Sequence, residues 1–527
     1  MNNDDSGKFV SAQGVSPLVA GLCGELQEEG VLFDLADPIV LEVLRADAMR
    51  MAALMDDPTE EPPMLWSGVP WPRDEDPLRS DYCLSISVGG SKMVSLLLRV
   101  EGGEAVGLGP AGEELRGEDL ERFAKANTRA TPNSGDTADG FAMIEKIVQA
   151  VCDQFKDNLQ ALEGCSNILL SWGFAGASER TDESLLGGLT ARTTLMTKKQ
   201  GAFTAELKGR DLCGLFANAF EKFLGWSRPV TVANDGIMAL HYFLDPRRRN
   251  NYSQVGLFIN GTGCNFALAE PYAVRPEGIV SAEGERYEPV HLKGNDEPDA
   301  GQTRINYFIN YEIGSIALEA TKARFDIMES YPIQTNALSG GNAFRQQFQG
   351  LGREYLGGDL FGRLLTSYSG RGGEECPEGP QVSALASFAP GSSAVPAALQ
   401  EMFPGVEMTV NEMEKLLFIC RVIVGRSALH AALLLAAVSF RVGFGFGDPE
   451  SGRKDLLGME GSIWSIEGYP EQVLHYWGLL CGERKLNVEL ASAPGFNASL
   501  RGPAFFAAIH ARRASSAEDA GESLKTY

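Results

Sequence analysis

Hydrophobic and polar residues alternate with two different periods along the chain, and the change of period separates helical regions from strands. Leu, Val and Met recur at helical spacing over residues 15–55, and a group of prolines between Pro58 and Pro72 ends this pattern. The period then becomes two over residues 84–88, and after Gly89-Gly90 a second strand pattern follows over residues 93–100. The sequence therefore predicts a helical start followed by a β-hairpin.

A second hairpin with the same plan is predicted over residues 254–269, with its turn at residues 260–263. Two unrelated hairpins would carry the same glycines, because tight turns need backbone freedom. Alternatively, the two turns face each other across a cleft and bind a polyphosphate through their backbone N–H groups. The other predicted elements are helices over residues 141–162 and 211–224, strands over 168–174 and 230–233, and mainly helices after residue 304.

Composition limits the classes of partner. The chain has 527 residues, more than one domain usually contains, and its net charge of −24 disfavours general binding to nucleic acid. Backbone N–H groups can still bind a phosphate locally. The most apolar run, residues 428–440, is shorter than the roughly 20 residues that a membrane span needs. It predicts a buried helix and no membrane partner.

Cysteine and histidine provide no framework for disulfides or metal. The nine cysteines include no C-x-x-C pair, and the five histidines lack the spacing of metal ligands. The first five residues are polar and acidic, unlike a secretory or mitochondrial leader. We therefore expect a cytoplasmic protein without a dedicated metal site, in which carboxylates carry any acid–base chemistry.

One carboxylate stands out as a candidate base. Asp235 follows a short apolar strand and precedes Gly236, which leaves room for a ligand beside the backbone. The same residues could instead form an ordinary Asn-Asp-Gly turn in which Asp235 caps the next helix. Likewise, Lys198 could bring positive charge to a phosphate, or could be a solvated surface lysine beside Lys199.

Short motifs occur in one order along most of the chain, from Met64 to Ile509. They are Ser87-Val88-Gly89-Gly90-Ser91-Lys92, residues 169–175, Thr197-Lys198, Asn234-Asp235, Gly261-Thr262-Gly263-Cys264-Asn265, Asn310-Tyr311-Glu312, Tyr355-Leu356-Gly357-Gly358, Glu460-Gly461-Ser462-Ile463-Trp464 with Tyr469-Pro470, and residues 499–504. In this order they resemble the phosphate, sugar and adenosine segments of the hexokinase family. The resemblance implies an α/β fold with two lobes and a cleft between them, the actin-like ATPase (ribonuclease H-like) fold.

The resemblance also implies an ATP-dependent hexose kinase that acts at the 6-hydroxyl, the entry step of glycolysis. Asp235 would be the catalytic base, and Lys198 would reach the γ-phosphate. The residues that would bind sugar hydroxyls are Thr197, Asn234, Asn265, Glu312 and Gln349. The residues that would bind ATP are Gly89, Gly90, Ser91, Gly261, Thr262, Gly263, Gly461 and Ser462, with Arg501 at the rim. Nucleotide oxygens and water would hold the Mg2+, so no protein ligand for the metal is predicted.

Some positions depart from the family pattern. Ser87 stands where the family has an Asp near Mg2+, Gly173 where it has a sugar-binding Ser, and a second sugar-binding Glu has no counterpart except Gln349. These departures favour an alternative, a hexokinase-like sugar or nucleotide sensor with little catalysis. The predicted organisation is an N-terminal helical segment (residues 1–80) on the large lobe, a small lobe (81–230), a large lobe (231–512) and a flexible tail (513–527).

Overall fold

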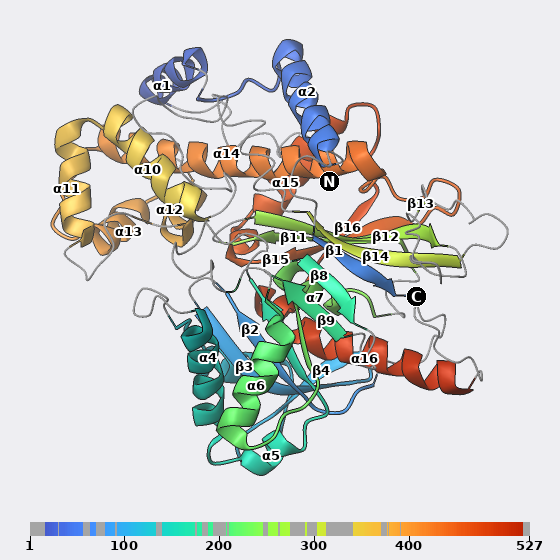
Figure 1. Ribbon diagram of the computed structural model, residues 1–527. Helices are drawn as coiled ribbons and strands as arrows, with labels where there is room; N and C mark the ends of the chain where they lie inside the picture. The colour runs from blue at the N-terminus through green and yellow to red at the C-terminus, as the bar shows by residue number, and fades with distance from the viewer. Residues whose placement is uncertain are drawn as a thin grey trace.

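The computed structural model describes most of the chain. The described residues are 16–29, 31–55, 64–69, 79–89, 92–132, 140–173, 177–181, 188–192, 207, 210–245, 251–261, 264–274, 290–291, 303–311, 341–369, 377, 379–389 and 391–519. They form two lobes, each built around one mixed seven-stranded sheet (Figure 1). The expected α/β class with two lobes is therefore confirmed.

The small-lobe sheet has the order β10-β7-β2-β3-β4-β5, and β6 also pairs with β3. Its strands are β2 (Cys83–Val88), β3 (Lys92–Glu101), β4 (Glu104–Leu108), β5 (Glu114–Leu115), β6 (Arg129–Ala130), β7 (Ile168–Trp172) and β10 (Val230–Asn234). Strands β2 and β3 form the first predicted hairpin, in which Gly89 N donates to Lys92 O at 2.9 Å. A separate hairpin, β8 (Ala177–Thr181) with β9 (Gly188–Arg192), lies beside β10.

The large-lobe sheet has the order β1-β14-β12-β11-β15-β16, and β13 pairs with β12. Its strands are β1 (Met64–Val69), β11 (Tyr252–Asn260), β12 (Cys264–Val274), β13 (Val290–His291), β14 (Thr303–Tyr311), β15 (Lys454–Glu460) and β16 (Val488–Ser492). Strands β11 and β12 form the second predicted hairpin, which the structure confirms.

The two sheets share one pairing scheme. From β4 through β3, β2 and β7 to β10, two antiparallel contacts are followed by two parallel ones. The series β14, β12, β11, β15 and β16 has the same sequence of contacts. The two hairpins therefore occupy equivalent positions, and their similarity reflects an internal repeat of the fold rather than turn chemistry alone.

Two helices join the lobes. Helix α7 (Asp235–Tyr242) packs against strands of both sheets, and α16 (Ala498–Asp519) packs against α7 and the small-lobe strands β2, β3 and β7 (Figure 1). Their backbones touch, because a Cβ atom at Gly502 would lie only 1.7 Å from Met238 O. Apolar residues of both sheets and both helices form one continuous buried cluster. The lobes are therefore joined through a shared core.

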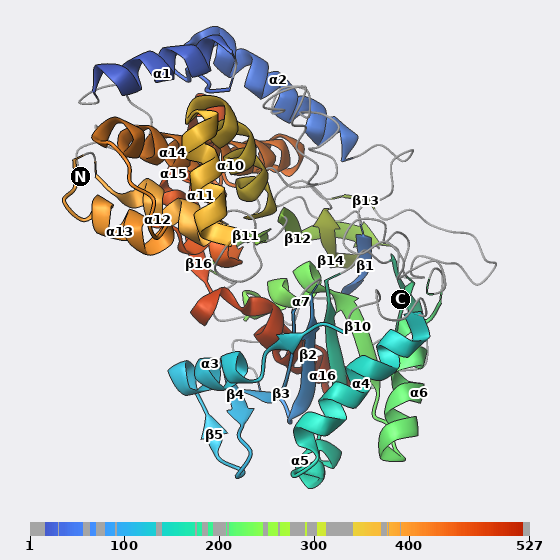
Figure 2. The ribbon, with the colours of Figure 1, turned by 90° about the vertical axis from the view of Figure 1, so that its left-hand side faces the viewer.

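The outer faces are covered by further helices. In the small lobe α4 (Gly140–Phe155), α5 (Leu159–Glu163) and α6 (Leu212–Leu224) enclose the second face of the sheet, and α3 (Gly117–Ala126) packs near β3 (Figure 2). In the large lobe the covering helices are α10 (Gly341–Tyr355), α11 (Gly358–Ser369), α12 (Gly379–Ser387), α13 (Val395–Met402), α14 (Val410–Val442) and α15 (Tyr469–Cys481). Helix α14 is long and apolar enough to cross a membrane, but its most apolar window is completely buried inside the protein. It is the core helix that the apolar run predicted.

The N-terminal helices α1 (Pro17–Glu28) and α2 (Pro38–Leu54) lie on the large lobe, where both contact α14 (Figure 1). The predicted organisation needs three corrections. Residues 64–69, expected within the helical segment, form strand β1 because they pair with β14 at the edge of the large-lobe sheet. Helix α16 belongs to the small lobe by its packing, and it extends through residues 513–519, which were expected to be a flexible tail.

Candidate active site

Strands from both sheets end at one place between the lobes. On the small-lobe side, Gly173 follows β7 and donates its N–H to Val88 O at 2.8 Å. A Cβ atom at Gly173 would lie 3.0 Å from Val88 O, 3.2 Å from Gly89 Cα and 3.2 Å from Asp235 Oδ2. The first hairpin turn and the Asp235 carboxylate therefore lie close to the end of β7, where a side chain larger than that of glycine would be tightly packed.

The large-lobe side repeats this arrangement. Gly461 follows β15, with φ +100° and ψ 156°, a backbone conformation that is essentially restricted to glycine. A Cβ atom there would lie 2.4 Å from Asn260 O and 2.9 Å from Gly261 N. The second hairpin turn therefore lies against the end of β15, just as the first lies against the end of β7.

Asp235 is the first residue of α7, and Asn234 is its N-cap. The side chains of Asn234 and Asp235 both accept from Gly236 N, each at 2.8 Å. Asn234 is buried, whereas Asp235 is half-buried. Asp235 lies in the first turn of α7, where the helix N-terminus offers a favourable place for negative charge. The alternative in which Asp235 caps the helix is therefore corrected, because Asn234 is the cap and Asp235 is the first helical residue, with its carboxylate beside the end of β7.

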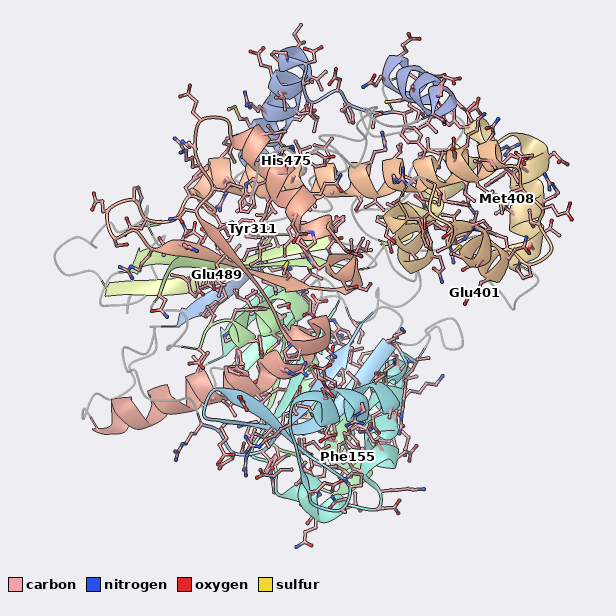
Figure 3. The ribbon with its side chains drawn as sticks, turned by 180° about the vertical axis from the view of Figure 1, so that it is seen from behind. Phe155, Tyr311, Glu401, Met408, His475 and Glu489 are labelled. Atoms are coloured by element: carbon pink, nitrogen blue, oxygen red, sulfur yellow. The ribbon has the colours of Figure 1, made fainter. Side chains whose placement is uncertain are left out.

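The end of β14 lies beside the same helix start. A Cβ atom at Gly236 would lie 2.8 Å from Asn310 Oδ1, so a larger residue after Asp235 would have to displace the Asn310 side chain. The next residue, Tyr311, is fully buried, and Arg441 fixes it by donating to its hydroxyl group and to Glu270 Oε1 (3.0 Å). Figure 3 shows Tyr311 in the large lobe, far from Phe155 at the end of α4.

A second carboxylate, Glu460, interacts electrostatically with Asp235. Glu460 is the last residue of β15 and is 6% exposed. Burial raises the pKa of Glu460 to about 7, hydrogen bonds from Ala498 and Ser499 oppose this rise, and the negative charge of Asp235 adds to it. The sequence motif contained Glu460, but the resemblance gave it no role. Its chemical signal is a carboxylate that directly follows the apolar run Leu456-Leu457-Gly458-Met459.

The remaining predicted residues that the structure describes fall in different places. Ser462 is exposed at the start of a short 3-10 helix, and Asn265 is half-buried on β12, where its Oδ1 accepts from Phe266 N at 2.9 Å. Gln349 is half-buried on α10, a helix that packs mainly against α11, α12 and α14 rather than against the strands of the junction.

Arg501 requires a correction. It was expected at the rim of the nucleotide site, but it is 4% exposed. Its guanidinium group donates to Pro494 O at 2.9 Å, to Asn497 O at 3.2 Å and to Glu121 Oε1 at 3.4 Å. Arg501 therefore ties the first turn of α16 to the preceding loop and to α3, and we remove it from the candidate nucleotide contacts.

Several predicted residues lie outside the described part of the chain. They are Gly90, Ser91, Thr197, Lys198, Thr262, Gly263 and Glu312. Their roles stay predictions. Four of them, Gly90, Thr262, Gly263 and Glu312, directly adjoin described residues of the junction.

The fold is similar to that of solved hexokinases. One hexokinase structure has a TM-score of 0.56 at 16% sequence identity, with 92% of this chain and 99% of that chain covered. The hexokinase of Schistosoma mansoni in complex with glucose has a TM-score of 0.55 at 15% identity, with 92% and 97% covered. No family model matches the sequence, and no curated protein is similar to it in sequence. The chain therefore has the two-lobed actin-like ATPase fold, as the sequence resemblance predicted.

Proposed function

We propose that the protein is an ATP-dependent hexose kinase that transfers the γ-phosphoryl group of ATP to the 6-hydroxyl group of a hexose. One observation carries the proposal. The half-buried carboxylate of Asp235 lies beside Gly173 at the end of a small-lobe strand, and the start of its helix lies beside Asn310 at the end of a large-lobe strand. Phosphoryl transfer needs little covalent chemistry from the protein beyond alignment, charge stabilisation and a proton acceptor, and this arrangement provides the acceptor between the lobes.

Asp235 is the proposed proton acceptor for the sugar hydroxyl. Its carboxylate is partly open to solvent, is fixed by its position at the start of α7, and accepts from Gly236 N. Asn234, Asn265, Thr197 and Glu312 are the proposed sugar contacts, with Gln349 the weakest candidate because of its place on α10. A sugar pocket needs many such partners, since an unpaired buried polar group costs about 1–3 kcal/mol.

The strand ends support the proposed nucleotide site. At Gly461 and Gly173 a Cβ atom would fill space beside the backbone of the adjoining turn, and the turns can direct N–H groups to phosphate oxygens. Gly89, Gly90, Ser91, Gly261, Thr262, Gly263, Gly461 and Ser462 are the proposed contacts. Lys198 would add positive charge. When bound, Mg2+ neutralises charge on the phosphates, and it needs few protein ligands.

The departures at Ser87 and Gly173 support a second candidate. Neither residue supplies the polar group that the family pattern has there, so the protein would bind sugar or nucleotide as a sensor with little turnover. Gly173 leaves open the space next to Asp235 Oδ2 that a serine side chain would occupy. We also propose a cytoplasmic location, which is supported by the free thiol state of every cysteine that the structure describes.

The test is ATP consumption and sugar-phosphate formation with Mg2+ on glucose, mannose, fructose, glucosamine and N-acetylglucosamine. We expect turnover of at least one sugar and its loss in Asp235→Ala. Thermal stability with sugar and with a non-hydrolysable ATP analogue is measured in parallel. Ligand-induced stabilisation without turnover of any sugar would contradict the kinase and leave the sensor.

A further inference from the structure

Glu460 connects the two lobes through hydrogen bonds. Its Oε2 accepts from Ala498 N at 2.6 Å, and its Oε1 accepts from Ser499 N at 3.2 Å and from Ser499 Oγ at 2.9 Å. Glu460 ends a strand of the large-lobe sheet, whereas Ala498 and Ser499 begin α16, which packs on the small-lobe sheet. One buried carboxylate therefore fastens the end of one sheet to the helix that covers the other.

The start of α16 is fixed on its other sides as well. Ser85 of β2 donates its hydroxyl group to Leu500 O at 2.7 Å, and Arg501 reaches α3 through Glu121. Gly502 lies in backbone contact with Met238 of α7. A shift of the first turn of α16 must therefore shift β2, which leads to the first hairpin turn, and α7, which begins with Asp235.

We propose that Glu460 is a positioning residue for phosphoryl transfer, which holds the first turn of α16 at the end of β15 and thereby fixes Asp235 between the lobes. The catalytic part of this inference rests on the proposed kinase function. The positioning itself rests on the hydrogen bonds and on the contact between α16 and α7.

Charge gives Glu460 a second connection to Asp235. Among the described residues, Glu460 interacts electrostatically with Asp235 of α7 and with Arg501 of α16, and Arg501 also interacts with Glu121 of α3. Because electrostatic coupling is mutual, an ionised Glu460 strengthens Asp235 as a proton acceptor. Glu460 loses its proton near neutral pH, so the rate of a working enzyme should rise with pH through about pH 7.

The following variants distinguish a positioning role of Glu460 from a purely local role as a cap of α16. Glu460→Gln keeps the size of the side chain but directs an NH2 group at a backbone N–H and removes the charge. Glu460→Asp keeps the charge, and Ser499→Ala removes only the hydroxyl hydrogen bond. Asp455→Asn is the matched control, because Asp455 is a buried carboxylate of the same strand that accepts from Gly445 N and Gly447 N at the opposite end.

The first measurement is the pH profile of kcat together with KM for sugar and ATP. We expect Glu460→Gln to lower kcat about tenfold to 10²-fold, with KM changed less than about twofold, since a small misplacement of catalytic groups mainly affects the chemical step. The rise near pH 7 disappears in this variant and stays in Asp455→Asn. Glu460→Asp recovers part of the lost rate. A Glu460→Gln profile that matches the wild type would overturn the proposal.

The second measurement needs no activity and uses amide hydrogen exchange of the whole chain. In Glu460→Gln we expect faster exchange, by about tenfold, in the first turn of α16 and also in the first turn of α7. Ser499→Ala gives a smaller change in both. Faster exchange limited to α16 would show a local cap and would overturn the proposal. If the wild type phosphorylates no sugar, the proposed function fails, while exchange in α7 still decides the role of Glu460.

Discussion

The two sheets are built on the same pairing scheme, yet they place their carboxylates in opposite environments. Each has a hairpin whose turn lies against a glycine that follows the neighbouring parallel strand, Gly173 in the small lobe and Gly461 in the large lobe. In the small lobe the carboxylate comes from the outer strand β10, as half-buried Asp235 at the start of α7. In the large lobe it comes from the middle strand β15, as buried Glu460.

This difference shows that equivalent positions in the two repeated sheets can have different roles. Asp235 is partly open to solvent and can meet a ligand, whereas Glu460 already accepts from the first turn of α16. The equivalent of Asn234 in the large lobe, Ser492 at the end of β16, is exposed and caps no helix, because the junction helix α16 begins only at Ala498. The repeat therefore fixes where strands end, and the residue at each end determines whether it serves chemistry or structure.

The largest expected effect comes from removing the small-lobe carboxylate. Asp235→Asn keeps the side-chain size and should lower kcat by between about 10²-fold and 10⁴-fold, because the sugar hydroxyl loses its proton acceptor. Sugar binding, measured by calorimetry, should change little. Asp211→Asn, at the N-cap of α6 on the outside of the same lobe, is the control and should retain activity. Equal losses in both variants would contradict the assignment of Asp235.

Gly461 and Gly173, which follow equivalent strands in the two lobes, provide the next test of the comparison between the lobes. Gly461→Ala should lower the free energy of unfolding by about 3–4 kcal/mol, because its φ of +100° and the 2.4 Å approach to Asn260 O both exclude a Cβ atom. Gly173→Ala should cost only about 1 kcal/mol, since its closest contact is 3.0 Å. Urea unfolding measures both.

The effect of Gly173→Ala on activity should be larger than its small effect on stability suggests. A methyl group at position 173 would lie 3.2 Å from Asp235 Oδ2 and should displace the carboxylate, so kcat should fall more than stability suggests. If Gly173→Ala were fully active, the contact between the end of β7 and Asp235 would have no catalytic importance.

Local patterns predicted much of this architecture. Both hairpins, α6 and the buried α14 follow from period and from turn glycines, and these signals lie within one element. Strand β1 was missed because its six residues lie in a proline-rich region and become a strand only by pairing with β14, which is distant in sequence. Whether a short apolar segment becomes a strand thus depends on a partner that the local sequence does not specify.

The candidate site, like the fold, was predictable from the sequence only where its signals lie within one short segment. Asp235 and the glycine turns were found because their motifs are contiguous. Glu460 acquires its role only through contact with α16, 38 residues further along the chain. Arg501 was placed at a rim because its motif closes the predicted nucleotide segment, but the packing of α16 turns it toward Glu121. The order of motifs along the chain does not predict tertiary contacts between residues that are distant in sequence.

The large-lobe carboxylate should make stability depend on pH. The folded state raises the pKa of Glu460 from 4.5 to about 7, so between these values the folded protein holds more protons than the unfolded chain. Stability relative to Glu460→Gln should therefore fall as the pH rises from 4.5 to 7, by up to about 3 kcal/mol, and stay constant above it. Urea unfolding at intervals of pH measures the difference. A difference that grows with pH would mean that the start of α16 stabilises the anion more than burial destabilises it.

The smallest expected effect concerns Arg501. The sequence placed it at the rim of the nucleotide site, whereas the structure gives it a role in holding the first turn of α16. Arg501→Lys keeps the charge but loses the planar group that serves two carbonyl oxygens and Glu121, so the free energy of unfolding should fall by about 1–2 kcal/mol. Affinity for ATP, measured by calorimetry, should stay within about twofold, because a side chain that is 4% exposed has no surface to offer a nucleotide. A large loss of ATP affinity without a loss of stability would return Arg501 to the nucleotide site. It would also mean that the first turn of α16, and with it the anchor of Glu460, faces the ligand rather than the protein core.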